Sequence, residues 1–263
     1  MACMSRVSLK FDYMAETRPP HQTILDLLGR RDQNYSRLLQ HFSTFEYAFK
    51  KIGTNEPKDP TEPYWGTVWL PPLDAISIYG LLAINRPAQY LEIGSGNSTK
   101  FARRSIRDNV LTTKITSIDP APRAEIDDIC DRVIRKPLQH VEADIFDLPE
   151  NSMVFLDGSH RALQNSDVTV FFCEVLPGLK SGTVVGVHDI FLPFDYPENW
   201  HGRAYSEQYM LLTTMLFGQA HFEIIMPVAH VRHAMSANPL SGLMNGYLSQ
   251  IKQGGGAFWF KVK

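Results

Sequence analysis

The chain has 263 residues, of which 44% are hydrophobic and 21% charged, so it is long enough to bury a large core in one globular unit. Its 26 Lys and Arg residues nearly balance 28 Asp and Glu residues, and no basic run or stripe is interleaved with aromatic residues. This composition argues against nucleic acid and against an anionic membrane as partners.

The first part of the chain, residues 1–70, is charged and dotted with prolines, and helical spacing appears over 33–51. It predicts an N-terminal helical cap followed by a meandering segment. Cys3, Cys130 and Cys173 lie far apart with no C-x-x-C pattern, which is typical of reduced thiols. Because no apolar run of signal-peptide length stands near the start, we expect a cytoplasmic protein.

Residues 71–263 are predicted to form one domain. The segment LDAISIYGLLAI at 73–84 predicts a helix that leads into a first strand, QYLEI. Short β-rich runs then alternate with helix-like segments: strands KITSID, DRVIRK, SMVFLD and GTVVGVHDI, with STKFARRSIRD, RAEIDDIC and 162–177 between them. This alternation is typical of parallel strands joined by crossover helices, and it predicts an open α/β sheet with helices on both faces.

The C-terminal part contains an amphipathic segment SEQYMLLTTMLFG, a strand FEIIMP, an insertion at 227–253 and a final strand in GGGAFWFKVK. No crossover-helix pattern separates the two strands, so the last strand is expected to be antiparallel. The insertion then emerges on the active face. Its apolar residues from Leu240 to Ile251 have helical spacing, which predicts a flap over the pocket or a contact with a second copy of the chain. A helix packed on the domain's own edge is the alternative.

The stretch YLEIGSGNST at 90–99 ends a strand with G-x-G, which lets the backbone approach a ligand while the next helix presents free N–H groups. Dinucleotide sites use G-x-G-x-x-G, but Thr99 stands at the third glycine, which weakens a nicotinamide interpretation. A carboxylate at Glu92 suits the amino group and sulfonium of S-adenosylmethionine (SAM). Asp119, at the end of the next strand, suits ribose hydroxyls.

Four motifs in order carry a family resemblance: E-x-G-x-G at Glu92 to Gly96, SIDP at 117–120, FLDGSHR at 155–161 and VVGVHDI at 184–190. Together they resemble class I SAM-dependent methyltransferases, in the group similar to cephalosporin-hydroxylase-type and macrolide sugar O-methyltransferases. The resemblance runs from about residue 65 to the end. It implies a Rossmann-like, seven-stranded mixed sheet with an antiparallel last strand. The SAM-binding residues expected on this basis are Glu92, Gly94, Gly96, Asn97, Ser98, Asp119, Gln139 and Asp157.

Two details of this SAM site depend on alignment. Ser98 stands where the family often has a third glycine, and it is expected to cap the following helix. If DRVIRK is the third strand, the adenine loop is Lys136-Pro137-Leu138-Gln139; if EADIFDL is aligned by its acid, Asp144 takes that role. We prefer the first interpretation, in which LQHVEADIFDLPEN is a helix and loop.

A cluster of acids and histidines follows the fourth and fifth strands: Asp157, His160, His188 and Asp189. Ligands of open α/β sheets bind beyond the carboxyl ends of the strands, so His160 or His188 is the candidate catalytic base. In metal-dependent relatives, acids after these strands hold Mg²⁺, and Asp157, His188 and Asp189 would match them, although His188 is a softer ligand than Mg²⁺ prefers. Without a metal, Asp157 bonds loop backbone and His188 is a neutral, satisfied histidine.

The sequence therefore predicts a SAM-dependent methyltransferase acting on an oxygen of a small polar or sugar-like acceptor. Arg203 or His201, in the aromatic loop FLPFDYPENWHGRAYSEQY, would orient that acceptor. An NAD-dependent oxidoreductase and a non-catalytic SAM-fold binding protein are the alternatives.

Overall fold

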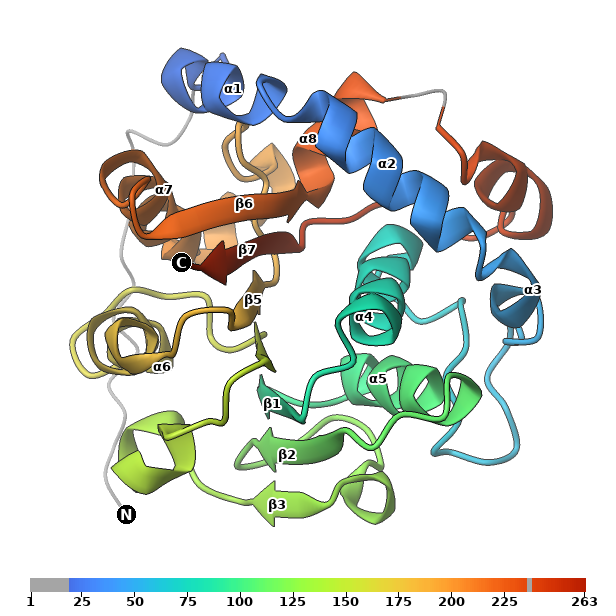
Figure 1. The fold of residues 1–263 in the computed structure, drawn as a ribbon, viewed down its shortest axis with the longest axis horizontal. Coiled ribbons are helices and arrows are strands. Elements are labelled where there is room, and N and C mark those ends of the chain that lie inside the picture. The colour runs from blue at the N-terminus through green and yellow to red at the C-terminus, as the bar shows by residue number, and fades with distance from the viewer. Residues whose placement is uncertain (1–18, 236–237) are drawn as a thin grey trace.

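A seven-stranded sheet forms the centre of the computed structural model, which describes residues 19–235 and 238–263 (Figure 1). Its strand order is β3-β2-β1-β4-β5-β7-β6. The strands are β1 (Gln89–Ile93), β2 (Lys114–Ile118), β3 (Arg132–Ile134), β4 (Ser152–Leu156), β5 (Val184–Val187), β6 (Phe222–Pro227) and β7 (Phe258–Val262). The sheet confirms the predicted α/β fold.

Strand β7 alone runs against the others, pairing antiparallel with β5 on one side and β6 on the other. The pairs β1–β2, β1–β4, β2–β3 and β4–β5 are parallel. The predicted antiparallel ending is therefore confirmed. As a result, the carboxyl ends of β1, β2, β4 and β5 share one edge of the sheet.

Helices cover both faces, with α4 and α5 on one side of the sheet and α6 and α7 on the other (Figure 1). The α-helices are α1 (Gln22–Gly29), α2 (Asp32–Ser43), α3 (Glu46–Phe49), α4 (Pro72–Asn85), α5 (Asn97–Asp108), α6 (Asp167–Val170), α7 (Glu207–Phe217) and α8 (Val228–Ala234). No helix within residues 19–235 and 238–263 has the length and apolar character needed to cross a membrane.

Two expected crossover helices are shorter than predicted. The link from β2 to β3 contains only a 3₁₀ turn, Asp127–Ile129, and the link from β3 to β4 contains two, Leu138–His140 and Ala143–Phe146. Prolines at 120, 122, 137 and 149 restrict these links, because a proline cannot donate a helical hydrogen bond. The segment predicted over 162–177 is α6 followed by a π-turn, Phe171–Val175, and a 3₁₀ turn, Leu176–Gly178.

The N-terminal helices pack directly on the sheet domain. A Cβ atom on Gly80 of α4 would lie 2.3 Å from the Phe42 ring of α2, so the glycine permits this close approach. Buried residues of α1 and α2, such as Leu28 and Leu39, belong to the same hydrophobic cluster as the strand residues. One continuous core thus contains residues from both sides of residue 70. The predicted division into a cap and a domain at that residue stays a prediction.

The insertion after β6 packs beside these helices. His230 Nε2 in α8 lies 2.8 Å from Asp32 Oδ1 of α2, and the Tyr247 hydroxyl donates to the Ile52 carbonyl at 2.8 Å. The helix expected over 240–251 is only a π-turn, Leu243–Tyr247. The described part of the insertion therefore packs on the edge of its own domain, which was the alternative to a flap.

Candidate active site

A cavity of about 540 Å³ opens at the carboxyl ends of the parallel strands. Most of the predicted site residues line it: Gly94, Gly96, Asn97, Ser98, Asp119, Gln139, Asp157, His160, His188 and Asp189. No described residue of the insertion 227–253 lines it, so the flap prediction finds no support in the fold. The glycine turn and the acid and histidine cluster therefore share one hollow.

The turn after β1 requires glycine at position 94. Gly94 has φ 78°, and a Cβ atom there would lie 1.8 Å from the Asp157 carbonyl oxygen. A Cβ atom on Gly96 would instead meet no atom within 4 Å, although Gly96 lines the cavity. The first glycine thus brings the ends of β1 and β4 together, and the second leaves room for a ligand.

Glu92 lies beneath this turn and not in the cavity. Its side chain is fully buried and accepts hydrogen bonds from the Thr99 hydroxyl and from the Tyr90 hydroxyl, the latter at 2.9 Å. The Thr99 hydroxyl also accepts from the Gly96 N–H at 3.0 Å. The position of Glu92 therefore differs from the predicted direct contact with SAM, because both carboxylate oxygens are used to hold the turn.

The expected cap at Ser98 is wrong. Helix α5 begins at Asn97, and the hydroxyl that accepts from the Gly96 backbone belongs to Thr99, one turn along. The residue that weakened the nicotinamide interpretation thus has a structural role of its own: it links the carboxylate of β1 to the start of α5.

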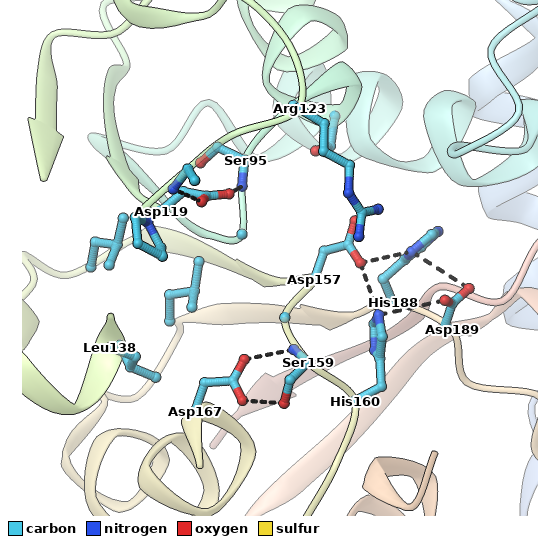
Figure 2. Close-up of a pocket in the computed structure, with 18 of the residues that line it drawn as sticks. Ser95, Asp119, Arg123, Leu138, Asp157, Ser159, His160, Asp167, His188 and Asp189 are labelled. Atoms are coloured by element: carbon cyan, nitrogen blue, oxygen red, sulfur yellow. Dashed lines mark hydrogen bonds and ion pairs between the residues drawn. The ribbon is translucent and has the colours of Figure 1, made fainter. Parts of the chain in front are cut away.

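One end of the cavity contains Asp119 and the loop after β3. Asp119 Oδ2 accepts from the Ser95 N–H and Oδ1 from the Ala121 N–H, each at 2.8 Å, which leaves one lone pair on each oxygen (Figure 2). The third strand is Arg132–Ile134, as in the preferred alignment, and residues 137–139 line the cavity, whereas Asp144 is exposed and does not. Their contact with adenine stays a prediction.

A buried network joins the two histidines to four carboxylates. His160 Nδ1 lies 2.9 Å from Glu207 and its Nε2 lies 3.3 Å from Asp157. His188 Nδ1 lies 3.2 Å from the same Asp157 oxygen, and its Nε2 lies 3.1 Å from Asp74. Figure 2 shows both rings linked to the Asp157 and Asp189 side chains.

These contacts determine the charge of the rings. Burial alone would lower the pKa of His160, but hydrogen bonds to Asp157 and Glu207 outweigh it and raise that pKa well above its ordinary value. The pKa of His188 is likewise raised against burial, by Asp157, Asp189 and Asp74. Burial would raise the pKa of Asp157, yet the two rings hold it well below its usual range. Each ring nitrogen also faces a carboxylate oxygen, and this arrangement favours the imidazolium form of both histidines.

Asp189 differs from Asp157 in its environment. It sits at the end of β5 with φ 54°, its side chain is 17% exposed, and it lines the cavity. Burial raises the pKa of Asp189, and His188 and His160 offset this only in part. Asp189 is thus the more basic of the two cavity carboxylates.

A divalent cation at Asp157, His188 and Asp189 is not supported. Within the described parts of the chain, no group of three or more His, Cys, Asp or Glu side chains is arranged to hold a metal ion. His188 Nδ1 faces the carboxylates, 3.2 Å from Asp157 and 3.7 Å from Asp189, instead of sharing an ion with them. A cation placed there would also face the positive charge of both rings.

The mouth of the cavity is formed partly by the aromatic loop. Arg203 and Tyr205 line it, whereas His201 does not. The Tyr205 ring lies 4.6 Å from the His160 ring, centroid to centroid. Trp69 and Arg123, which the sequence did not single out, also line the cavity. The W-L-P-P pattern at 69–72, where α4 begins, is the only sequence signal near Trp69.

A family described as "Methyltransferase domain" matches residues 91–190, the segment from β1 to the end of β5. A comparison with curated protein sequences found no match.

Several solved structures are similar at low identity. The SAH-bound methyltransferase PaMTH1 from Podospora anserina is 14% identical, with 94% of this chain and 99% of that chain covered and a TM-score of 0.45. The O-methyltransferase from Bacillus cereus in complex with SAH is 14% identical, with 92% and 95% covered and a TM-score of 0.41.

The family match covers the strands and loops that build the cavity, and the sheet has the antiparallel last strand that the resemblance implied. Residues 91–190 are thus similar to a methyltransferase domain, and this segment supplies most of the residues that line the cavity.

Proposed function

We propose that the chain methylates an oxygen of a small polar acceptor, with sugar-like metabolites in this class. The observation that supports this most is the sharing of one cavity by two sets of residues. Gly96, Asp119 and Gln139 lie toward one end, and Asp157 and Asp189 lie at the strand ends beside it. A cofactor and an acceptor bound to these two sets would lie next to each other.

The cavity wall fits SAM at its first end. Asp119 has a free lone pair on each carboxylate oxygen, which suits two ribose hydroxyls, and the space over Gly96 admits a ligand. Leu138 and Gln139 supply an apolar surface and an amide for a purine. When bound, SAM supplies an electrophilic methyl group on a sulfonium.

The second end of the cavity contains the groups that would take a proton from the acceptor hydroxyl. We predicted His160 or His188 as the base, but both rings use both nitrogens on carboxylates and carry a proton already. We therefore assign the base role to Asp189, whose raised pKa favours proton uptake. The two imidazolium rings then act as positioning residues that hold Asp157 and offset the negative charge.

Ligand binding tests the proposal at its first step. SAM and S-adenosylhomocysteine (SAH) should raise the melting temperature and NAD should not, because Thr99, which is bound to Glu92, stands where a dinucleotide site needs a third glycine. SAH release should then be measured with a panel of hydroxyl-bearing small molecules. Stabilisation by NAD alone would favour the oxidoreductase, and SAH binding without any turnover would favour a non-catalytic binding protein.

A further inference from the structure

Two arginines on the cavity rim have aromatic rings as their partners. The Arg203 guanidinium carbon lies 3.8 Å from the centroid of Trp200 and 5.6 Å from that of Tyr205. The Arg123 guanidinium lies 4.5 Å from the centroid of Trp69. Among the residues that the structure describes, neither guanidinium has a carboxylate within ion-pair distance. Both are exposed, and both line the cavity.

The acids that line the same cavity differ from these two arginines, because each acid has a hydrogen-bond donor or a histidine partner inside the protein. Asp119 accepts from backbone N–H groups, Asp167 accepts from the Ser159 N–H at 2.6 Å, and Asp157 and Asp189 face the histidines. The two guanidiniums are therefore the charged groups of this wall that have neither a hydrogen-bond donor nor an oppositely charged partner among the described residues. A guanidinium stacked on a ring keeps its N–H edge free, which suits bidentate binding of a carboxylate or phosphate.

Arg203 is held in place relative to the reacting end. The His160 carbonyl accepts from the Ser206 N–H at 2.8 Å, and the Ser206 hydroxyl accepts from the Ala162 N–H at 2.9 Å. Arg161 Nε donates to the Arg203 carbonyl at 2.9 Å. The loop is thus fastened to the strand end that carries Asp157, so Arg203 stands one aromatic ring, Tyr205, away from His160.

We propose that Arg203 binds an anionic group of the acceptor, a carboxylate or a phosphate, while the hydroxyl to be methylated reaches Asp189. This inference rests on the proposed methyl transfer and names the acceptor as an anionic hydroxyl compound. Arg123 lies instead in the loop after β2 that follows Asp119, and it stacks on Trp69, three residues before α4. It provides a matched control: a second exposed arginine, stacked on a tryptophan in the same cavity.

The test uses matched pairs of acceptors that differ only in charge. One arm compares protocatechuate with its uncharged amide, and the other compares a hexose phosphate with the free hexose. SAH release is measured for the wild type, Arg203→Gln and Arg123→Gln, and SAH affinity is measured for each by calorimetry. In at least one arm the anionic member should have a kcat/KM roughly 10- to 100-fold higher, the range expected for charge-assisted hydrogen bonds.

Arg203→Gln should abolish this preference and leave SAH affinity unchanged, whereas Arg123→Gln should retain the preference. The arm that responds tells a carboxylate from a phosphate. Equal use of both members of each pair, use of neutral members only, no use of any member, or a preference that survives Arg203→Gln would overturn the inference. Failure to bind SAH at all would instead refute the proposed function, so the two failures are distinguishable.

Discussion

Replacing Glu92 by Gln tests the buried carboxylate beneath the glycine turn. Burial raises the pKa of Glu92 from 4.5 to about 7, against the hydrogen bonds from Thr99, Ser98 and Tyr90. The folded protein therefore binds a proton that the unfolded chain has lost between about pH 4.5 and about pH 7. At about 1.4 kcal/mol per pH unit, the ionised carboxylate costs the folded state roughly 3 kcal/mol above this window.

Gln removes this cost, because its amide is neutral and still accepts from Thr99, while its NH₂ group donates to Tyr90. We expect the free energy of unfolding of the wild type to fall relative to Glu92→Gln as the pH rises from about 5 to about 8. Urea denaturation across this range measures the difference, with Glu150→Gln, an exposed glutamate, as the control. A constant difference between wild type and Glu92→Gln across the range would refute the reasoning.

The same variant tests where Glu92 lies. Because Glu92 does not line the cavity, SAH affinity measured by calorimetry at low pH should change little. A loss of about tenfold or more, roughly 1.4 kcal/mol, would show that the carboxylate contacts the cofactor, as the sequence first suggested.

Three further variants probe the two ends of the cavity. Asp119→Ala should weaken SAH binding by roughly 1–3 kcal/mol, measured by calorimetry, because ribose hydroxyls and two backbone N–H groups lose an acceptor. Equal SAH affinities of the wild type and Asp119→Ala would refute the proposed ribose contact. Gly94→Ala should lower the melting temperature far more than Gly182→Ala: both glycines have positive φ, but only at Gly94 would the Cβ atom meet a carbonyl oxygen. Similar decreases in melting temperature for the two glycine variants would mean that the turn relaxes to accommodate the Cβ atom. Asp189→Asn should lower kcat by at least about 100-fold with SAH affinity intact, and a retained kcat would exclude Asp189 as base.

The parts of the fold that follow from local pattern were predictable. Alternating β-rich and helix-like runs predicted the parallel strands, and the missing crossover pattern before GGGAFWFKVK predicted the reversal of β7. Gly94 and Asp119 were found because the glycine turn and the following strand end are short-range features. Gln139 was found because the third strand was placed correctly.

The parts that depend on long-range contacts were not predictable. Asp74 lies 114 residues from its partner His188, and Glu207 lies 47 from His160. No local spacing relates these pairs, so the sequence showed four rim residues but not the carboxylates behind them. Their contacts raise the pKa of both rings, which is why we propose Asp189 as the base in place of a histidine. The packing of the insertion also depends on long-range contacts, because Leu240 and Leu243 are buried in the main hydrophobic cluster.

The position of β7 between β5 and β6 affects how the chain folds while it is being synthesised. Strands β1 to β5 are able to pair with one another as soon as they leave the ribosome, since the order β3-β2-β1-β4-β5 contains no later strand. Strand β6 has no described neighbour except β7, so it must wait, with its apolar side chains uncovered, until the later strand emerges. Trp259 arrives at the same moment, stacking on Phe155 and donating to Ser77 of α4. A nascent chain stalled before Phe258 would therefore expose the unpaired edge of β5 to chaperones. Proteases would cleave α7 and β6 in preference to the paired strands.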